Sequence, residues 1–591
     1  MKKIFSFLIL AIAIISCNNK SQSVEANKDL ATLLDQYYEE RLQLFPLEAT
    51  SNGDNRFNDR LYIDFTNSYR EKLKTFYSNY ENQISKFERA ALNENDQISY
   101  DVFKREMQMS IKGLSFKDNL APLNQFWGLH LTLGQLGSGE GNQPFKTVED
   151  YDNWVRRATV FSEWTDSAIA YFKKGINENY VLPKSLVVKI IPQCKSLVVD
   201  DITTSLFWGP IKKLPATFND ADKKRITEEY TNLLKEQIIP SYKKLGDFFE
   251  KEYLVNARTT SGINGNPTGD EYYKYLIQYW TTTNKTPEEI YTTGLAEVKR
   301  IREEMVRVMN ETGFYGNESS LKAFFEFMKT DKQFMPFKTA EDVLNAYRSV
   351  QKNIDPNLKK MFGMVPKTPF EIRQTEAFRA ASASAEYNQG SADGSRPGIF
   401  YVPIIDATKY NTTSGLESLF LHEAIPGHHY QISLQQENES LPKFRRFSWY
   451  GAYGEGWALY CESLGKELGL YTDPYQYMGA LGDEIHRAIR LVVDVAIHTK
   501  NMSREEAIKY MMDNEAISEE GATAEIERYM AIPAQALSYK TGALKIQELR
   551  DKYKKQHGEK FSLKNFHDVI LKDGCLPLDV LEKKMDTWAK P

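Results

Sequence analysis

The sequence predicts a mostly α-helical protein, and two capped, periodic segments carry the prediction. Thr286 and Glu289 form a capping box, the side-chain pairing that begins many helices, and apolar residues then recur every three or four positions as far as Val308. Ser503 begins a second such segment, with Glu506 at its third helical position. Most of the chain has the same amphipathic rhythm without internal repeats. Its 591 residues suffice for two lobes or for one large helical body.

The N-terminus is expected to be a bacterial export signal. The apolar run Ile4–Ile15 is too short to span a bilayer comfortably and suits the core of a signal peptide over residues 1–16. Ser16 directly before Cys17 resembles a lipobox, in which Cys17 is lipidated and becomes the mature N-terminus. The alternative is a plain secretory signal with an incidental cysteine. Residues 17–28 are polar and would tether the body to a membrane.

Composition narrows the range of partners. Acidic and basic residues are interspersed, the formal net charge is -5, and 41% of the residues are hydrophobic. Nothing in this balance indicates a nucleic-acid surface. We expect a protein of the cell envelope, facing the periplasm or the surface, that contacts the membrane only through its lipid anchor. No obligate protein partner is inferred.

One segment breaks the helical rhythm and is the best candidate for a strand. A loop over Asn388–Pro397 leads into Gly398–Ile405, and Pro403 within that segment favours an edge position. An edge strand just upstream of a metal-binding helix could pair with an extended peptide, which makes Tyr401 a candidate substrate-binding residue. An incidental short strand is the equally simple alternative.

The stretch His422–His429, with the sequence HEAIPGHH, is the most informative motif in the chain. In HExxH, two histidines one helical turn apart bind a metal, and the glutamate after the first handles protons. A helix is expected to begin near Ser414, which forms a capping box with Glu417. Pro426 and the glycine after it then predict a helical bulge, which can return a later histidine to the face of His422.

The pattern predicts a site for one zinc ion. His422 and His428 are the expected histidine ligands, with His429 as the competitor for the second place, because on an unbroken helix it would nearly eclipse His422. The expected third ligand is Glu455, with Glu462 in the second shell or as its replacement. Glu423 is the expected general base. A purely structural cluster is the alternative.

Five spaced motifs resemble a known bacterial family, the domain of unknown function 885 family. They are SRPGIFYV (Ser395–Val402), HEAIPGHHYQ (His422–Gln431), GEGWALYCE (Gly454–Glu462), RLVVDVAIH (Arg490–His498) and PAQALSYKTG (Pro533–Gly542). This family resembles the helical zinc peptidases that include carboxypeptidase Taq, angiotensin-converting enzyme and neurolysin. The resemblance implies a two-lobed helical ellipsoid with a deep central channel and a short β-sheet beside the active-site helix. Dipeptidyl peptidase III, whose second histidine also follows a glycine in a lengthened motif, supports His428.

The resemblance also gives roles to C-terminal residues. Tyr539 is similar to a tyrosine that stabilises the oxyanion in such peptidases, and Tyr529 is the reserve. Arg487, Arg490 and His498 lie on one polar arc of a helix, which is either an exposed face or part of the channel wall. In the second case an arginine of the arc would bind a peptide carboxylate.

The sequence thus predicts an exported zinc metallopeptidase that cleaves peptides small enough to enter a channel. Its helical domain is expected over residues 29–591, with an N-terminal part to about 285 and a catalytic part from about 286. The alternatives are a non-catalytic lipoprotein that captures peptides, its metal site lapsed, and a metal-dependent amidase acting on cell-wall peptides.

Overall fold

The computed structural model describes residues 25–589 except 377–383, 392–393 and 395. Helices dominate these residues, and the strands among them form one small sheet, so the mostly α-helical fold is confirmed. Among the described helices, none is both long and apolar enough to cross a bilayer. The signal peptide and the lipidation site Cys17 lie outside the described residues.

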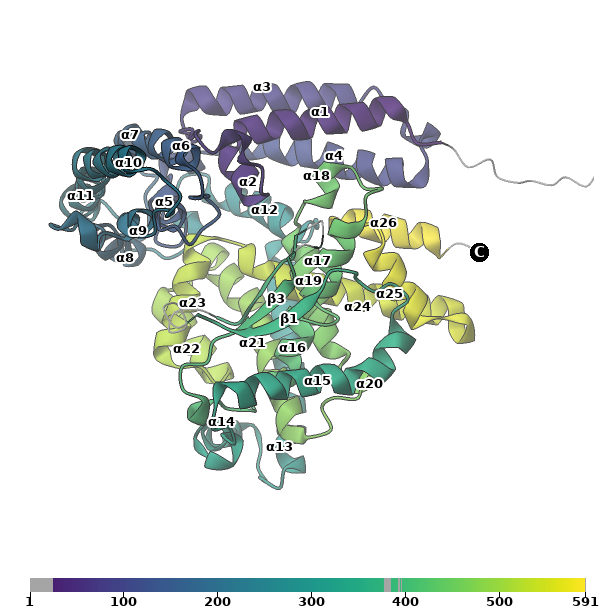
Figure 1. Cartoon of the computed structure of the whole chain (residues 1–591). Helices are drawn as coiled ribbons and strands as arrows, with labels where there is room; N and C mark the ends of the chain where they lie inside the picture. The colour runs from purple at the N-terminus through teal and green to yellow at the C-terminus, as the bar shows by residue number, and fades with distance from the viewer. Residues whose placement is uncertain (1–24, 377–383, 392–393, 395, 590–591) are drawn as a thin grey trace, which may run out of the picture.

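Helices α1 (Lys28–Leu44), α3 (Asn67–Ile84) and α4 (Glu94–Gly113) form a layer along one side of the molecule, purple in Figure 1. The Asn27 side chain caps α1 by accepting a hydrogen bond from the Leu30 N–H. The apolar faces of these helices join the same hydrophobic core as the C-terminal helices; for example, the rings of Phe103 and Phe444 lie 5.4 Å apart, edge to face. The N-terminal layer therefore packs directly on the C-terminal body.

A second group of helices, from α5 (Leu129–Gly137) to α11 (Ile239–Phe248), forms a lobe with its own core around Trp154, Tyr230 and Tyr242 (Figure 1). The next helix, α12 (Gly269–Thr281), packs instead against helices of the C-terminal body. These contacts join residues on both sides of the boundary expected near residue 285, and the division itself stays a prediction. The deep channel remains a prediction.

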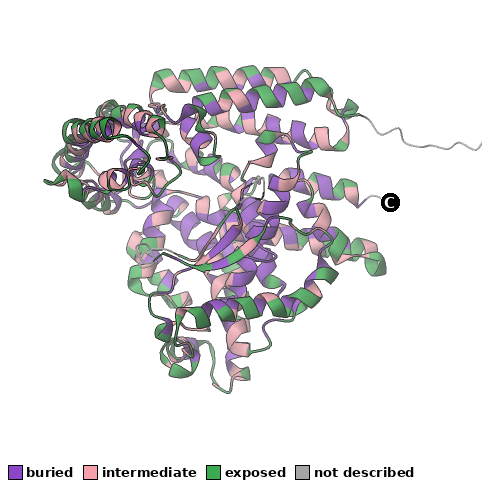
Figure 2. Cartoon of the chain, viewed as in Figure 1, coloured by how far each residue is buried: buried purple, intermediate pink, exposed green. Residues whose placement is uncertain are grey.

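The C-terminal body is built around two long helices, α13 (Pro287–Glu311) and α21 (Pro474–Thr499), which pack along each other. The capping box at the start of α13 is confirmed, and so is the one that begins α22 (Arg504–Asn514). Burial is densest in the helices around the sheet, purple in Figure 2. Helix α23 (Glu519–Ala531) follows α22.

The sheet has three strands in the order β1 (Phe370–Gln374), β3 (Gly398–Val402), β2 (Glu386–Asn388). Strand β3 runs parallel to β1 and antiparallel to β2. The predicted strand is therefore present, but its edge position is wrong, because β3 is the central strand. Pro403 follows the last residue of β3, so its missing N–H removes no ladder hydrogen bond.

Four helices carry the candidate site: α16 (Leu416–Glu423), α17 (His428–Glu437), α19 (Gly451–Ser463) and α24 (Ser538–His557). Helices α19 and α24 approach closely where Gly456 faces Gly542. A Cβ atom on Gly456 would lie only 2.6 Å from the Gly542 Cα, so the contact requires glycine.

The other α-helices of the described residues are α2 (Pro46–Ser51), α6 (Val148–Thr159), α7 (Phe161–Asn177), α8 (Lys184–Lys195), α9 (Gly209–Lys212), α10 (Asp220–Leu233), α14 (Leu321–Thr330), α15 (Ala340–Met361), α18 (Lys443–Arg446), α20 (Gly465–Leu468), α25 (Leu563–Leu571) and α26 (Leu578–Trp588).

Candidate metal centre

The HEAIPGHH motif is split between two helices. Helix α16 ends at Glu423 and α17 begins at His428, with four non-helical residues between them. A Cβ atom on Gly427 would collide with the His422 carbonyl oxygen, so this close return of the chain requires glycine. The indole Nε1 of Trp457 donates a hydrogen bond of 2.9 Å to the Pro426 carbonyl and holds the connection against α19. The expected bulge is therefore a complete interruption of the helix.

The start of α16 also differs from the expectation. Its first residue is Leu416, and Gly415, with a φ of 76°, precedes it. The Glu417 carboxylate accepts the backbone N–H of Tyr471, 2.7 Å away, and so does not cap its own helix. The capping box expected at Ser414 is wrong, because a tertiary partner takes the glutamate.

The helix break brings three possible ligands together: His422 from α16, His428 from α17 and Glu455 from α19. The Nε2 atoms of His422 and His428 lie 3.6 Å and 3.5 Å from Oε2 of Glu455. One ligand atom from each residue falls within 4.8 Å of the others, and the three form a cluster that could hold a metal ion. The geometry of the described residues thus groups His428 with His422, as the preferred sequence interpretation requires.

Zinc suits this donor set. Its bonds to imidazole nitrogen and carboxylate oxygen are about 2.0–2.2 Å long, so two ligands of a tetrahedral ion lie roughly 3.3–3.5 Å apart. The two nitrogen–oxygen separations are close to that value before any adjustment of rotamers. Two imidazoles and a carboxylate are also a usual protein ligand set for catalytic zinc.

Glu462 lies behind the cluster and orients His422. Its Oε1 is 2.7 Å from Nδ1 of His422, and both side chains are buried. A carboxylate on the far nitrogen of a ligand histidine fixes the ring and its tautomer, and Glu462 lies where it can do this for His422. Nδ1 of His428 has no hydrogen-bond partner among the described residues; its ring packs 5.8 Å from that of Trp449.

The charges of the cluster residues favour a protonated His422 beside an ionised Glu455 when no metal is bound. Burial lowers the pKa of His422, but the carboxylates of Glu455 and Glu462 outweigh burial and hold this pKa well above its usual value. Burial raises the pKa of Glu455, and its hydrogen bonds to His422 and His428 outweigh that effect and lower it. Glu455 is therefore ionised, as a carboxylate must be to bind a metal ion.

Glu423 is the last residue of α16 and is partly buried beside the cluster. Its Oε2 accepts a 2.9 Å hydrogen bond from the backbone N–H of Tyr387 in β2. Burial raises the pKa of Glu423, while the charges of His422 and His428 oppose this effect. A carboxylate held in one place, with its pKa moved toward neutrality, suits proton transfer.

His429 points away from the cluster and toward the sheet. Its Nδ1 lies 3.0 Å from the Tyr387 hydroxyl and 3.3 Å from Oγ of Ser433, and its ring packs against Phe370. Burial lowers the pKa of His429 to about 4. The structure therefore does not bring His429, the alternate ligand, to His422 and Glu455.

Tyr387 is the residue of this site that sequence reasoning missed. Its backbone holds Glu423 and its hydroxyl holds His429, so one strand residue positions neighbours on two helices. Strand β2 has only three residues, too few to show alternation in the sequence. The contact between its hydroxyl and His429 joins residues 42 positions apart, so no neighbouring residues in the sequence indicate it.

Arg490 is 5% exposed, and Tyr529, the alternative candidate for the oxyanion-binding tyrosine, holds it in place. Its Nε donates to the Tyr529 hydroxyl at 2.9 Å and its Nη2 to Glu525 at 3.0 Å, while Nη1 is buried without a partner in the described structure. The guanidinium also lies over the ring of Tyr539, 4.7 Å from its centroid. Tyr529 is thereby committed to an ion network, whereas Tyr539 contributes a ring face to it.

Arg487 lies one turn earlier on α21. It pairs with Asp483 at 3.5 Å, and its Nε is buried and unpartnered among the described atoms. Burial lowers its pKa, but the charges of Glu462 and Asp483 prevail and raise it. Glu462, the residue that orients His422, is thus one of the two carboxylates whose charge acts on Arg487.

The remaining two predicted residues have other surroundings. Both ring nitrogens of His498 are used: Nδ1 accepts from the Ile263 N–H at 2.9 Å, and Nε2 donates to the Tyr529 carbonyl at 3.1 Å. His498 is completely buried, so it is a structural residue and has no free nitrogen for a peptide, contrary to expectation. Tyr401 is partly buried in the central strand.

The fold and the site together define a class: a large, mostly helical protein with a histidine–histidine–glutamate cluster at the break between helices α16 and α17. A family described as "Bacterial protein of unknown function (DUF885)" matches residues 46–585, and the chain belongs to this family. No curated protein matches the chain.

Two solved structures are similar over nearly their whole length. A protein from Colwellia psychrerythraea, described as a candidate lipoprotein, is 26% identical, with a TM-score of 0.85 over 96% of this chain and 99% of the other. A candidate lipoprotein of unknown function from Shewanella oneidensis is 20% identical, with a TM-score of 0.75 over 94% and 99%. The second likeness is one of fold alone.

Proposed function

We propose that this protein is an exported, lipid-anchored zinc metallopeptidase. The observation that carries the proposal is the approach of His422 and His428 to one carboxylate oxygen of Glu455, at 3.6 and 3.5 Å, with Glu423 next to them. A structural metal would need ligands only. The additional carboxylate of Glu423, held by a backbone N–H, is what a hydrolytic site requires.

In this proposal His422, His428 and Glu455 would hold zinc, and a zinc ion there would supply Lewis-acid chemistry for a peptide carbonyl and a water molecule. Glu423 accepts the proton of the attacking water and returns it to the leaving amine. Its fixed hydrogen bond to Tyr387 limits the positions from which it can act. Burial of the cluster excludes bulk water and strengthens these interactions.

Residues of α21 and α24 complete the proposed site. Tyr539 would donate a hydrogen bond to the oxyanion, with its ring fixed beneath the guanidinium of Arg490. Arg490 and Arg487 each keep one buried N–H nitrogen without a partner among the described groups. Protein atoms cover both nitrogens, so binding of a peptide carboxylate by either arginine stays a prediction and does not itself support the site.

The location of the protein is also part of the proposal. An apolar N-terminal run followed by Ser16 and Cys17 predicts lipidation, and both similar structures belong to candidate lipoproteins. We infer that lipidated Cys17 anchors the body to a membrane of the bacterial envelope.

Metal content and hydrolysis of a mixed peptide library test the proposal. Wild-type protein should carry one zinc per chain and cleave peptides, whereas Glu423→Gln should keep the metal and lose at least about a hundredfold in rate. A wild type that binds metal and peptides but cleaves none would favour peptide capture. Cleavage confined to cell-wall peptides would favour the amidase. If the protein contains no metal and a chelator leaves its free energy of unfolding unchanged, the metal site is refuted.

A further inference from the structure

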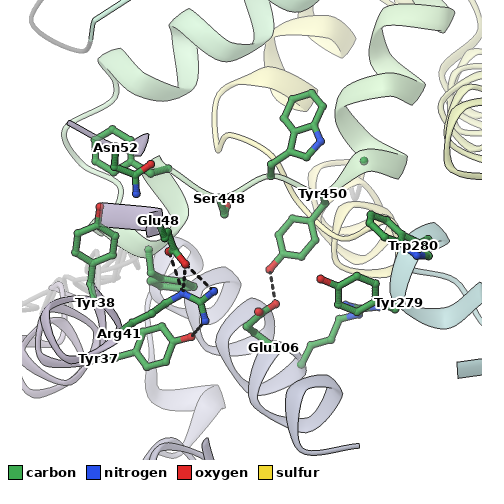
Figure 3. A pocket seen from close by; sticks show the side chains of 15 residues that line it. Tyr37, Tyr38, Arg41, Glu48, Asn52, Glu106, Tyr279, Trp280, Ser448 and Tyr450 are labelled. Atoms are coloured by element: carbon green, nitrogen blue, oxygen red, sulfur yellow. Dashed lines mark hydrogen bonds and ion pairs between the residues drawn. The ribbon is translucent and has the colours of Figure 1, made fainter. Parts of the chain in front are cut away.

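A pocket of about 240 Å³ lies between the N-terminal helices and the start of α19 (Figure 3). Its wall includes Trp449, Tyr450 and Gly451 from the chain that leads into α19. Opposite them lie residues of α1, α4 and α12. The volume equals that of about eight water molecules, enough for one side chain or a chain end.

The pocket is near enough to receive part of a peptide bound at the metal. Gly451 precedes Glu455 by four residues, which is about 6 Å along a helix. The ring of Trp449 lies 5.8 Å from that of His428. Because an extended chain advances about 3.3–3.6 Å per residue, the wall that Trp449 forms lies within about two residues of a bond held at the cluster.

The two arginines that line the pocket, Arg41 and Arg105, both have partners of their own. Arg41 is neutralised by Glu48, with its Nε and Nη2 3.0 and 2.9 Å from the carboxylate. Arg105 donates to the Gln278 carbonyl at 2.8 Å and has Asp579 at 3.8 Å.

Glu106 makes no ion pair within 4 Å among the described residues, although Arg41 and Arg105 line the same pocket. Its one recorded hydrogen bond in the described structure is a long one, 3.4 Å, from the Tyr450 hydroxyl, and Figure 3 shows the two side chains pointing toward each other. A partly buried carboxylate satisfied only by a neutral hydroxyl favours the approach of a positive charge.

Aromatic rings surround this carboxylate. Tyr279 and Trp449 are 45% and 46% exposed although both line the pocket, and Trp280 and Tyr37 add to the wall. Aromatic faces attract organic cations, and a nearby anion adds to this attraction.

We propose that this pocket binds a positively charged group of the substrate, with Glu106 as its counter-ion and the aromatic rings as its walls. The inference rests on the proposed peptidase function and names its substrate class: peptides with an organic cation a few residues from the scissile bond. The cation is the side chain of lysine or arginine, or the ammonium group of the peptide's N-terminus. All three groups are organic cations, which a carboxylate and aromatic faces attract.

Binding of three matched peptides to the full chain with Glu423→Gln tests this proposal. The first is blocked at both ends and contains one lysine, the second has norleucine in its place, and the third is the norleucine peptide with a free N-terminus. We expect the lysine peptide, the free-amine peptide or both to bind at least about tenfold more tightly than the neutral one. The peptide that shows the preference identifies the source of the cation.

Replacement of the counter-ion gives the decisive comparison. Glu106→Gln should remove the preference while leaving the affinity for the neutral peptide unchanged, and Tyr279→Leu should reduce it. Glu94→Gln, which removes an exposed carboxylate from the first turn of the same helix, is the matched control and should retain the preference. Equal binding of all three peptides, failure of all three to bind, or a preference that survives Glu106→Gln would overturn the proposal.

The two proposals fail in different ways. Metal-dependent hydrolysis of peptides without a charge preference would refute the cation pocket and leave the peptidase. A Glu106-dependent preference in a protein that binds no metal and cleaves nothing would refute the peptidase and leave the pocket.

Discussion

Nδ1 of His422 and Oε1 of Glu462 lie 2.7 Å apart in the interior of the protein. If His422 binds zinc through Nε2, replacement of Glu462 by glutamine should lower zinc affinity about 10–100-fold, because the amide orients the imidazole less strongly than a carboxylate does. Competition with a chromophoric chelator measures this. Glu467→Gln, which affects an ion pair with Arg550, is the control and should leave zinc affinity unchanged.

The two histidines after Gly427 should behave differently. His428→Ala should abolish stoichiometric zinc binding. His429→Ala should keep the metal but lower the free energy of unfolding by about 1–3 kcal/mol, because it leaves Tyr387 and Ser433 without their histidine partner. Metal analysis and urea unfolding of both variants provide the comparison. Loss of zinc in His429→Ala alone would reverse the assignment.

Trp457 should stabilise the connection between α16 and α17. Trp457→Phe keeps an aromatic ring but leaves the Pro426 carbonyl without its donor, so we expect the free energy of unfolding to fall by about 1–3 kcal/mol. Chemical denaturation measures the loss. A change below about 0.5 kcal/mol would show that the hydrogen bond is dispensable.

The glycine contact between α19 and α24 predicts a large steric effect. A Cβ atom on Gly542 would collide with the Ala452 carbonyl, so Gly542→Ala should destabilise the protein by more than about 2 kcal/mol and reduce any activity through displacement of Tyr539 and Glu455. Gly482→Ala is the matched control, since nothing lies within 4 Å of the added atom. It should stabilise α21 by up to about 1 kcal/mol.

His498 should make the fold sensitive to acid. Burial lowers its pKa in the folded protein to about 3, from an ordinary value of 6.5. Between these values only the unfolded chain binds the proton, so the free energy of unfolding decreases as the pH falls from 6.5 toward 3, by up to about 1.4 kcal/mol per pH unit. His498→Gln should remove this part of the slope. An identical slope in urea unfolding at pH 4–7 would contradict the assignment.

Features encoded by neighbouring residues could be predicted from the sequence. The capping boxes that begin α13 and α22 are present because each needs only residues three apart. Pro426 and Gly427 predicted a distorted helix, and the interruption there brings His428 to His422 and Glu455. The choice between His428 and His429 depended on backbone chemistry that is local to the motif.

Features that depend on distant partners could not be predicted. Glu417 bonds to Tyr471 rather than capping its own helix, and β3 is central because β1 and β2 flank it after folding. His498 shares a helical face with Arg490, but that periodicity does not reveal that backbone groups of two other segments occupy both its nitrogens. Helical periodicity identifies a face and says nothing of what covers it.

The position of β3 has a consequence for the chemistry of recognition. Strand β2, which lies on the side of Glu423, has three residues, and the N–H of the middle one is already bonded to that glutamate. The strand therefore offers a ligand little backbone to pair with. Specificity should depend on side chains and chain ends, and a substrate with N-methylated amides away from the scissile bond should lose little affinity.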